Sequence, residues 1–301
     1  MTGFDYSAWA APIDRTAFDA FVGDAKSAQL QPEPDGPGSS SSQTSVSVGI
    51  ASGVVGAAML AVTLVYRAMG GEGFLVAVGL IVAVAGFCGA IYLLIRNGAR
   101  FAERWRMYYR ATWFAGSNGL EYVVRQAVPN YDGMLFHMPS DRHETNYVYV
   151  RRDSPVIETG QMCHTYNLRG GRRGSRTRLW GYVVVELSFE VPSRSVLRSN
   201  AEHNEAAMSL KFAQKVGDAT PLSDSHTLYS PPESAPVSRQ LFTPELLGRI
   251  GSLETRFGPV NAEVTGNHLY VFSKKPFDLY DATTVRLVFD TIAAALASDV
   301  A

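Results

Sequence analysis

Two long runs without a charged residue constrain this chain more than any other feature of its sequence. VSVGIASGVVGAAMLAVTLVY occupies residues 46–66, and GFLVAVGLIVAVAGFCGAIYLLI occupies residues 73–95. At about 1.5 Å of rise per residue, each run is long enough as a helix to cross a hydrocarbon core of ~30 Å. Core helices of soluble proteins are rarely uncharged over two successive segments of this length. The two runs therefore predict two transmembrane helices.

A secretory signal peptide is the alternative explanation for the first run. Such a peptide has a basic region close to its start, whereas residues 1–45 are polar and acidic. We therefore reject that alternative. Only the six residues RAMGGE, 67–72, connect the two predicted helices. A connection this short requires the helices to run antiparallel, so it predicts a hairpin with residues 67–72 as its external loop.

The orientation of the hairpin follows from the distribution of arginine. Residues 96–110 contain five arginines and one acidic residue, Glu103, whereas the loop 67–72 has one arginine and one glutamate. The five arginines are Arg96, Arg100, Arg104, Arg106 and Arg110. Because cytoplasmic flanks are enriched in Lys and Arg, we expect a multi-pass protein of the plasma membrane with both termini in the cytoplasm.

Small residues recur four positions apart on both predicted spans. Such faces allow helix backbones to approach closely in lipid, so they predict packing within the hairpin or between two copies of the chain. Glycine and alanine are also common in spans without any packing role, and the sequence leaves both explanations open. The residues are Gly49, Gly53 and Ala57 on the first span, and Gly79, Ala83, Gly86 and Ala90 on the second.

Residues 1–45 are expected to form a cytoplasmic helix and a linker. Phe18, Phe21 and Val22 lie at helical spacing, which predicts a short amphipathic helix from about Asp14 to Ala28. QPEPDGPGSSSSQTS then has the composition of a flexible linker.

Residues 96–301 are expected to form a cytoplasmic α+β domain. ARFAERWRMYYRATWFAGSNG predicts a helix that ends at Gly116 or Gly119. Thr243 and Pro244 have the types preferred at a helix start, and DATTVRLVFDTIAAALAS predicts a closing helix. NAEVTGNHLYVFSKK predicts a hairpin that turns at Gly266-Asn267. Strand-like runs occupy residues 120–125, 133–138, 146–152, 156–167, 179–191 and 226–230.

Because the strands precede the helices, the predicted fold class is a two-helix transmembrane hairpin followed by a soluble α+β domain with a largely antiparallel sheet. About 200 residues are ample for an independent core, so we expect residues 100–301 to fold without the spans. The order NGLEY, YDGMLF, WGYVVVEL, LYSPP, LFTPELLGRI and VNAEVTGNHLYVFS resembles an uncharacterised, largely actinobacterial family of membrane proteins. The resemblance covers roughly residues 100–295 and implies two N-terminal spans with a C-terminal domain of unknown function. It implies no catalytic residue.

Motifs that would identify an enzyme are missing from the sequence. Gly170, Gly171 and Gly174 lack the spacing and the lysine of a phosphate loop, and no zinc-protease, hydrolase, dinucleotide or kinase motif occurs. His137, Asp141 and His143 could in principle meet a metal. Besides the two histidines, however, no third strong ligand is spaced nearby, so we predict neither a metal nor a cofactor.

Two further sets of residues were candidates for catalysis. Cys163 and His164 are neighbours on a strand, so their side chains point to opposite faces, and we expect a buried cysteine beside an exposed histidine. Glu158, Glu186, Glu190 and Glu263 form an acid–base pair only if the fold brings two of them together. The predicted function is therefore a membrane-tethered interaction or scaffolding domain, with a membrane-anchored enzyme that lacks a motif as the alternative.

The most basic stretch of the chain is LRGGRRGSRTR, residues 168–178. Strand-like runs flank it, which predicts the tip of a long β-hairpin from Cys163 to Val185. A tip that faces the membrane would contact anionic lipid head groups, at about 1 kcal/mol per arginine, and a tip that faces away would be solvated or meet an acidic partner. The arginines concerned are Arg169, Arg172, Arg173, Arg176 and Arg178.

Nucleic acid is not expected as a partner, because the net charge is −1 and the loop has no aromatic residue for base stacking. The predicted partners are the lipid bilayer, anionic lipid head groups, an unidentified protein and a second copy of the chain.

Overall fold

The computed structural model describes residues 3–28, 60–65, 67–68, 70, 73–167, 175–201 and 215–299. The chain divides into two compact units. The sheet unit comprises Met1–Pro12 and Tyr109–Ala301, and the helical unit comprises Ile13–Tyr108. Residues 1–12 thus belong to the same unit as the predicted α+β domain, which the sequence had not indicated.

The described part of the helical unit consists of α2 (Arg15–Ser27), a short helical segment at residues 60–65, and most of α4 (Gly73–Ser117). The side chain of Asp14 accepts hydrogen bonds from the backbone N–H groups of Thr16 and Ala17, so α2 begins as predicted. The ring of Phe21 contacts those of Trp105 and Tyr108 on α4, at centroid distances of 6.5 and 5.3 Å. These contacts bury the apolar side of α2.

α4 is a single helix of 45 residues that includes the predicted second span. Among the described residues, one helical stretch, Leu80–Ser117, is long and apolar enough to cross a membrane, with a mean hydropathy of 1.9 in its most apolar window. Most of the predicted first span, including Gly49, Gly53 and Ala57, lies outside the described residues. The two-helix hairpin is therefore not established by the structure, whereas the mostly antiparallel sheet with helices is.

α4 ends at Ser117, and Gly119, one of the two predicted positions, caps it. Gly119 has a φ of +64°, the left-handed conformation that glycine adopts at low cost. The N–H of Leu120 donates to the carbonyl oxygen of Ala115 at 2.8 Å, and the N–H of Gly119 donates to that of Gly116 at 3.3 Å. This is the hydrogen-bond pattern of a Schellman cap.

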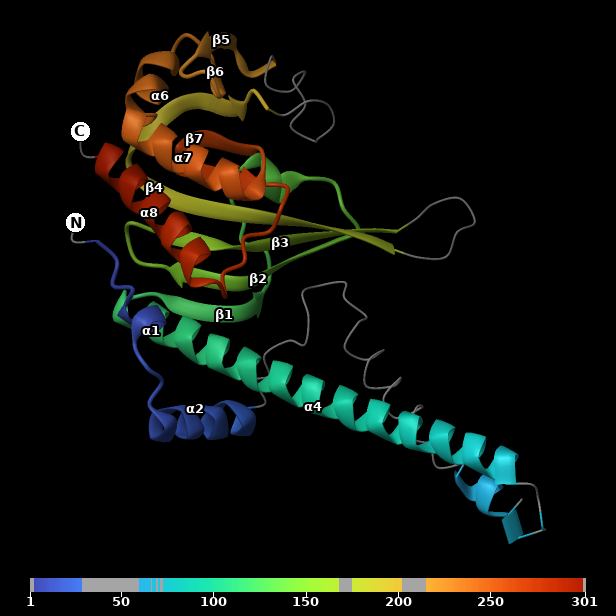
Figure 1. Ribbon diagram of the computed structural model, residues 1–301. Coiled ribbons are helices and arrows are strands. Elements are labelled where there is room, and N and C mark those ends of the chain that lie inside the picture. Colours follow the sequence, from blue (N-terminus) through green and yellow to red (C-terminus); the bar gives the residue numbers. More distant parts are fainter. Residues whose placement is uncertain are drawn as a thin grey trace. The chain divides into compact units, whose positions relative to one another are not determined.

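The sheet unit contains a seven-stranded antiparallel sheet (Figure 1). The strand order is β1-β2-β3-β4-β6-β5, and β7 also pairs with β4. The strands are β1 (Glu121–Gln126), β2 (Arg142–Arg151), β3 (Ile157–Asn167), β4 (Ser175–Ser199), β5 (Asp218–Pro221), β6 (His226–Ser230) and β7 (Val260–Ser273). The helices of this unit, besides the end of α4, are α1 (Ser7–Ala10), η1 (Met134–His137), α6 (Ala235–Leu241), α7 (Pro244–Phe257) and α8 (Ala282–Ser298).

Both faces of the central strands are covered, which explains why β4 contains the nearly continuous apolar run WGYVVVEL. The helices α7 and α8 lie over one face (Figure 1). Against the other face, Leu135 and Phe136 of η1 pack in a cluster that includes Tyr182 and Phe272 of the sheet. Successive side chains of a strand point to opposite faces, so a strand covered on both sides needs apolar residues at every position.

The two long helices of the helix layer form where they were predicted. The hydroxyl of Thr243 accepts a hydrogen bond from the N–H of Leu246 at 3.3 Å, and Pro244 occupies the first turn of α7. α8 is capped by Asp281, whose carboxylate accepts from the N–H of Thr284 at 2.7 Å. The buried side of α8 consists of Val285, Val288, Phe289, Ile292 and Leu296.

Two strand predictions are wrong. Residues 133–138 form η1 rather than a strand, because Met134, Leu135 and Phe136 are all buried in succession and do not alternate between two faces. β7 is one continuous strand rather than a hairpin at Gly266-Asn267, because both of its halves pair with β4. The φ of +56° at Gly266 accommodates a shift in the β4–β7 register instead of a turn.

Candidate functional site

The arginine-rich stretch is the tip of the predicted hairpin. β3 pairs with β4 from Ile157↔Val185 to Asn167↔Ser175, so the hairpin prediction is confirmed. Arg176 and Arg178 are exposed on β4, and the guanidinium of Arg178 lies 5.7 Å from the centroid of the Tyr166 ring. Arg169, Arg172 and Arg173 lie outside the described residues. Contact between these arginines and lipid stays a prediction.

The small residues of the second span lie on α4. Ala83 and Ala90 are buried, with 5% and 8% of their surface exposed, whereas the intervening Val84 and Phe87 are exposed. Gly86 is partly buried, and Gly79 lies in the same helix. The predicted role of these residues in helix–helix packing stays a prediction, since their expected partners on the first span lie outside the described residues.

The histidines of HMPSDRH do not form a metal site with the residues around them. His143 Nδ1 lies 2.6 Å from the Ser140 hydroxyl, while His137 is exposed. Among the described residues, no group of three or more His, Cys, Asp or Glu is placed to hold a metal ion. We therefore assign no ligand role to His137, Asp141 or His143.

Cys163 and His164 belong to successive positions of β3, as predicted, but the expected exposure of His164 is wrong. His164 is fully buried, and burial lowers the pKa of its imidazole to about 4. Its Nδ1 lies 3.4 Å from the Ser140 hydroxyl. Both residues are thus structural parts of the sheet, because neither is accessible to a substrate.

Two of the four candidate carboxylates are buried and hold loops against the sheet. Glu158 accepts hydrogen bonds from the hydroxyls of Tyr131 and Tyr182, at 3.1 and 2.6 Å. Burial raises the pKa of Glu158, and these two hydrogen bonds partly oppose the rise. Such contacts fix the segment before η1 to β3 and β4, which is a structural role.

Glu263 is the second buried carboxylate. It lies 2.7 Å from the guanidinium of Arg194 and accepts a hydrogen bond from the N–H of Met134 at 2.8 Å. Burial raises the pKa of Glu263 to about 7, although Arg194 and the Met134 N–H act in the opposite direction. The partner contacts of Glu158 and Glu263 are separate, so the two carboxylates do not form an acid–base pair. Glu190 is exposed.

A third cluster combines a serine, a histidine and a glutamate. The hydroxyl of Ser199 donates to the carboxylate of Glu254, whose other oxygen lies 3.4 Å from His226 Nε2. A catalytic serine would instead donate to the imidazole and face a substrate. Because Ser199 and His226 are fully buried, this arrangement stabilises the fold and does not form a nucleophile.

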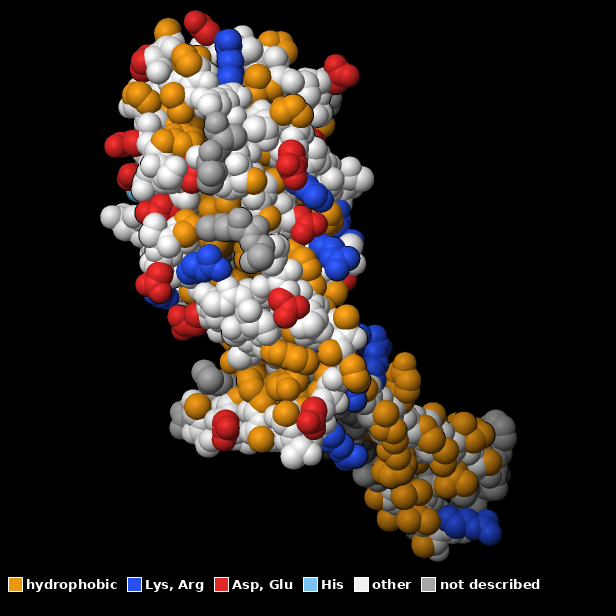
Figure 2. Space-filling view, turned by 90° about the vertical axis from the view of Figure 1, so that its left-hand side faces the viewer, with side chains coloured by type: hydrophobic (Ala, Val, Ile, Leu, Met, Phe, Trp, Pro, Cys, Tyr) orange, Lys and Arg blue, Asp and Glu red, His pale blue; other side chains and the backbone are white. Residues whose placement is uncertain are grey.

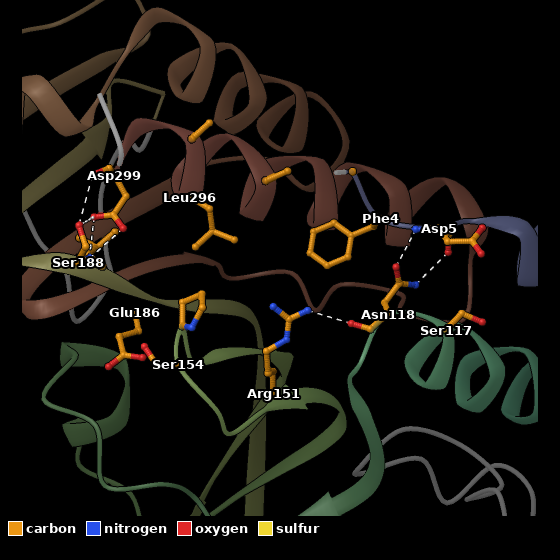
Figure 3. Close-up of a pocket in the computed structure, with 15 residues that line it drawn as sticks. Phe4, Asp5, Ser117, Asn118, Arg151, Ser154, Glu186, Ser188, Leu296 and Asp299 are labelled. Atoms are coloured by element: carbon orange, nitrogen blue, oxygen red, sulfur yellow. Dashed lines mark hydrogen bonds between the residues drawn. The ribbon is translucent and has the colours of Figure 1, made fainter. Parts of the chain in front are cut away.

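A pocket of about 790 Å³ lies in the sheet unit, between the N-terminal segment, the end of α4, β4 and α8 (Figure 3). One part of its lining is apolar, formed by side chains that include Phe4, Leu187 and Leu296. Polar side chains, among them Arg151 and Glu186, complete it. Its volume falls within the range of ~300–1,000 Å³ that is typical of small-molecule sites.

The N-terminal segment is held firmly as one wall of this pocket. The ring of Phe4 packs against Phe289 of α8 with centroids 4.8 Å apart. The N–H of Asp5 donates to the side-chain oxygen of Asn118 at 2.7 Å, and the Asn118 amide donates back to the Asp5 carbonyl oxygen at 2.9 Å. Further along, the Tyr6 hydroxyl donates to Asp290 at 2.8 Å. We call residues 3–12 the N-terminal strap.

The pocket carboxylates are engaged by neighbouring N–H groups. Glu186 accepts from the N–H of Val156 at 2.8 Å, and Asp299 accepts from that of Ser188 at 2.7 and 2.9 Å. The lining contains no His, Cys or Lys, and the Ser188 hydroxyl in it donates to the Asp299 carboxylate at 2.9 Å. Because that carboxylate also accepts from the Ser188 N–H, this contact joins β4 to the residue after α8, and the lining supplies no imidazole, thiol or amine.

Most of this pocket was missed by the sequence analysis. Of the predicted candidates, only Glu186 lines it, and its other residues come from segments far apart in the chain. One signal was present: Phe4, Tyr6 and Trp9 place three aromatic residues within six positions, before Pro12. Aromatic residues in such a segment indicate that it packs against something.

No protein-family model matches the chain, and no curated protein matches its sequence. Among solved structures, a distant likeness is to a chain described as the crystal structure of the mycobacterial trehalose monomycolate transport factor A, TtfA. The two share 10% sequence identity at a TM-score of 0.36, over 62% of this chain and 95% of that chain. Similarity at this level assigns neither a fold nor a function, and the expected family resemblance stays a prediction.

Proposed function

We propose that this protein is an integral membrane protein whose sheet unit is a non-enzymatic binding module on the cytoplasmic side. Residues 46–66 and 73–95 would form the membrane hairpin, with both termini in the cytoplasm. The proposal combines the two uncharged runs of the sequence with the surface of the helical unit.

The observation that carries the proposal is the distribution of exposed hydrophobic side chains. Among the described residues, every large hydrophobic side chain that is exposed lies between Leu60 and Phe101. Figure 2 shows such side chains as a nearly continuous orange surface at the lower right of the view. Only 12% of the most apolar window of α4 is buried, whereas a core helix would be mostly covered. An apolar surface of this extent is expected where a protein meets lipid.

The orientation is supported by the arginines that follow the apolar part of α4. Arg96, Arg100 and Arg106 are exposed, in the three helical turns that follow the end of the predicted span at residue 95. Positive residues at this position favour the cytoplasmic side. A binding role for the sheet unit is supported by its pocket, whose lining contains no His, Cys or Lys.

Reporter fusions test the proposed topology. A phosphatase that is active only outside the cytoplasm should be inactive when fused after residue 301 and active when inserted at Gly70. Green fluorescent protein, which fluoresces only when folded inside, should give the opposite pattern at the same two sites. Phosphatase activity at residue 301 would contradict the proposed orientation, and cells with no membrane-bound fusion protein would contradict the anchor itself.

The arginine-rich tip is the second element of the proposal: Arg169, Arg172, Arg173, Arg176 and Arg178 would contact anionic head groups. In nanodiscs, hydrogen exchange of residues 168–178 should be slower with anionic than with neutral lipid, and raised salt should remove the difference. A variant with all five arginines changed to alanine is the control. Equal exchange in both lipids would rule out this contact.

A further inference from the structure

Arg151 is an arginine without an ion-pair partner at a pocket wall. Its guanidinium donates to the carbonyl oxygen of Asn118 at 2.9 Å, and no carboxylate of the described residues lies within ion-pair distance of it. Its neighbour Arg152 on the same chain segment pairs with Glu121 at 3.8 Å. Figure 3 shows the guanidinium of Arg151 pointing into the pocket. Its remaining N–H groups are therefore placed to meet a ligand.

The acidic residues of the lining limit the charge of that ligand. Asp5, Glu186 and Asp299 are all pocket residues, and each accepts hydrogen bonds from backbone N–H groups, which hold its carboxylate in place. Their charges repel every anionic ligand, and the repulsion grows with the number of negative charges that the ligand carries, so a singly charged anion is opposed least. A head group with one negative charge can instead bind to the guanidinium, which pairs well with carboxylate and phosphate oxygens.

The apolar part of the lining indicates what accompanies the head group. Phe4, Leu187 and Leu296 contribute large apolar side chains, and Pro155, Ala293 and Ala297 extend this surface. Leu296 and Leu187 are only 6% and 4% exposed, so most of the apolar surface that a ligand could cover comes from Phe4, Pro155 and Ala293, which are half-buried, and from Ala297, which is exposed. An apolar chain placed along this surface would remove hydrophobic area from water.

We propose that the pocket around Arg151 binds an amphiphile with a singly charged anionic head group, which pairs with Arg151, and an apolar chain, which lies against Phe4 and Leu296. The head group is a carboxylate or a phosphodiester, since both carry one negative charge. This inference rests on the proposed role of the sheet unit as a binding module. It does not depend on the orientation of the membrane hairpin.

Photo-crosslinking of the full chain, purified and held in amphipol without free detergent, tests this inference. One probe is a long-chain fatty acid that carries a diazirine on its chain, and the second is its uncharged alcohol. A third is a lysophospholipid with a phosphodiester and the same diazirine. Mass spectrometry of peptides then locates the label.

The fatty acid should label peptides that contain Phe4 or Leu296, and the alcohol should label them at least about tenfold less, as expected for loss of a charged hydrogen-bonded pair. Arg151→Ala should reduce the labelling by the acid to the level of the alcohol. Arg152→Ala is the matched control, because it removes the same charge one residue away, and it should label like the parent. Leu296→Trp, which fills the pocket, should prevent labelling of the pocket peptides by every probe.

The comparison of the acid with the lysophospholipid distinguishes a free fatty acid from a membrane phospholipid as the source of the head group. Equal labelling of the parent and Arg151→Ala, or equal labelling by acid and alcohol, would overturn the inference. So would labelling confined to residues 73–95, which reports partition onto the apolar helix alone. Because reporter fusions test the anchor separately, failure of the pocket and failure of the membrane proposal give different results.

Discussion

The fold of the sheet unit disfavours the ionised form of the Glu263 carboxylate. Its carboxylate is fully buried, and its pKa is raised by burial from 4.5 to about 7 in spite of the nearby Arg194. The folded state therefore holds the proton of Glu263 over a pH range in which the unfolded chain has released it. This group makes the folded protein less stable as pH rises through that range.

We expect Glu263→Gln to flatten the pH dependence of stability between pH 4.5 and about 7. In the parent protein, this residue should lower the free energy of unfolding by roughly 3 kcal/mol across the window. Chemical denaturation at a series of pH values measures the difference. Glu190→Gln, at an exposed position, should leave the pH profile unchanged. A parallel profile for Glu263→Gln and the parent would show that the carboxylate is not protonated in the fold.

Single residues were predictable from sequence where their role is local. Asp14 and Thr243 cap helices through N–H groups two or three positions away, so their neighbours alone specify them. The partner of Glu263 is Arg194, which is remote in sequence and on another strand, and no local pattern indicates it. No local pattern indicates Arg151 either, because its proposed role depends on the lack of an ion-pair partner among the described residues.

Among the secondary-structure elements, the end of α4 gives the sharpest comparison. Gly119 has a positive φ, whereas Gly116 does not, and an added Cβ would meet no atom within 4 Å at either position. We expect Gly119→Ala to destabilise the protein by about 1 kcal/mol or more, because alanine is strained in the left-handed conformation. Gly116→Ala lies in the helix and should stabilise it by up to about 1 kcal/mol. Thermal melts of the two variants measure the contrast, and destabilisation by both would contradict it.

Elements with a strong internal pattern were predicted well. α7, α8 and the β3–β4 hairpin combine a clear period with caps or turn residues, and the structure confirms them. The errors at η1 and β7 have a common cause. A short apolar run does not specify whether its side chains alternate between two faces. A glycine with positive φ is compatible with a β-bulge as well as with a turn. In both cases tertiary pairing decided the outcome.

For the whole molecule, the division of the chain corrects the expected boundary of the independent domain. The N-terminal strap belongs to the sheet unit, where Ala8 and Trp9 are buried. The Arg110 guanidinium donates to the carbonyl oxygens of Trp9 and Ala11, at 2.6 and 3.4 Å. The end of the strap thus contacts Arg110, one residue after the second segment of the sheet unit begins at Tyr109.

We expect a protein that joins residues 3–12 to residues 109–299 by a short Gly/Ser linker to fold without the apolar runs. Residues 109–299 alone should melt at a lower temperature, because loss of the strap exposes aromatic residues such as Phe114 and Phe289. Differential scanning calorimetry of both proteins tests this. Trp9→Ala in the joined protein should lose about 3 kcal/mol or more of stability, whereas equal melting with and without the strap would contradict its role.

The layered α+β architecture was accessible from sequence because it depends on the order of strands and helices. The pocket was not, because its walls come from the strap, α4, β4 and α8, which meet only in the folded chain. Periodicity identifies which face of an element is buried, but it does not identify where two buried faces leave a space between them.

The hydrogen bond between Tyr6 and Asp290 joins residues 284 positions apart. At ~5–20 residues per second of synthesis, roughly 15–60 s pass between the emergence of the two partners from the ribosome. Both apolar runs and all seven strands of the described residues are made during that interval. The strap can therefore meet Phe114 and Asn118 soon after they are made, but its contacts with α8 form only at the end of that interval.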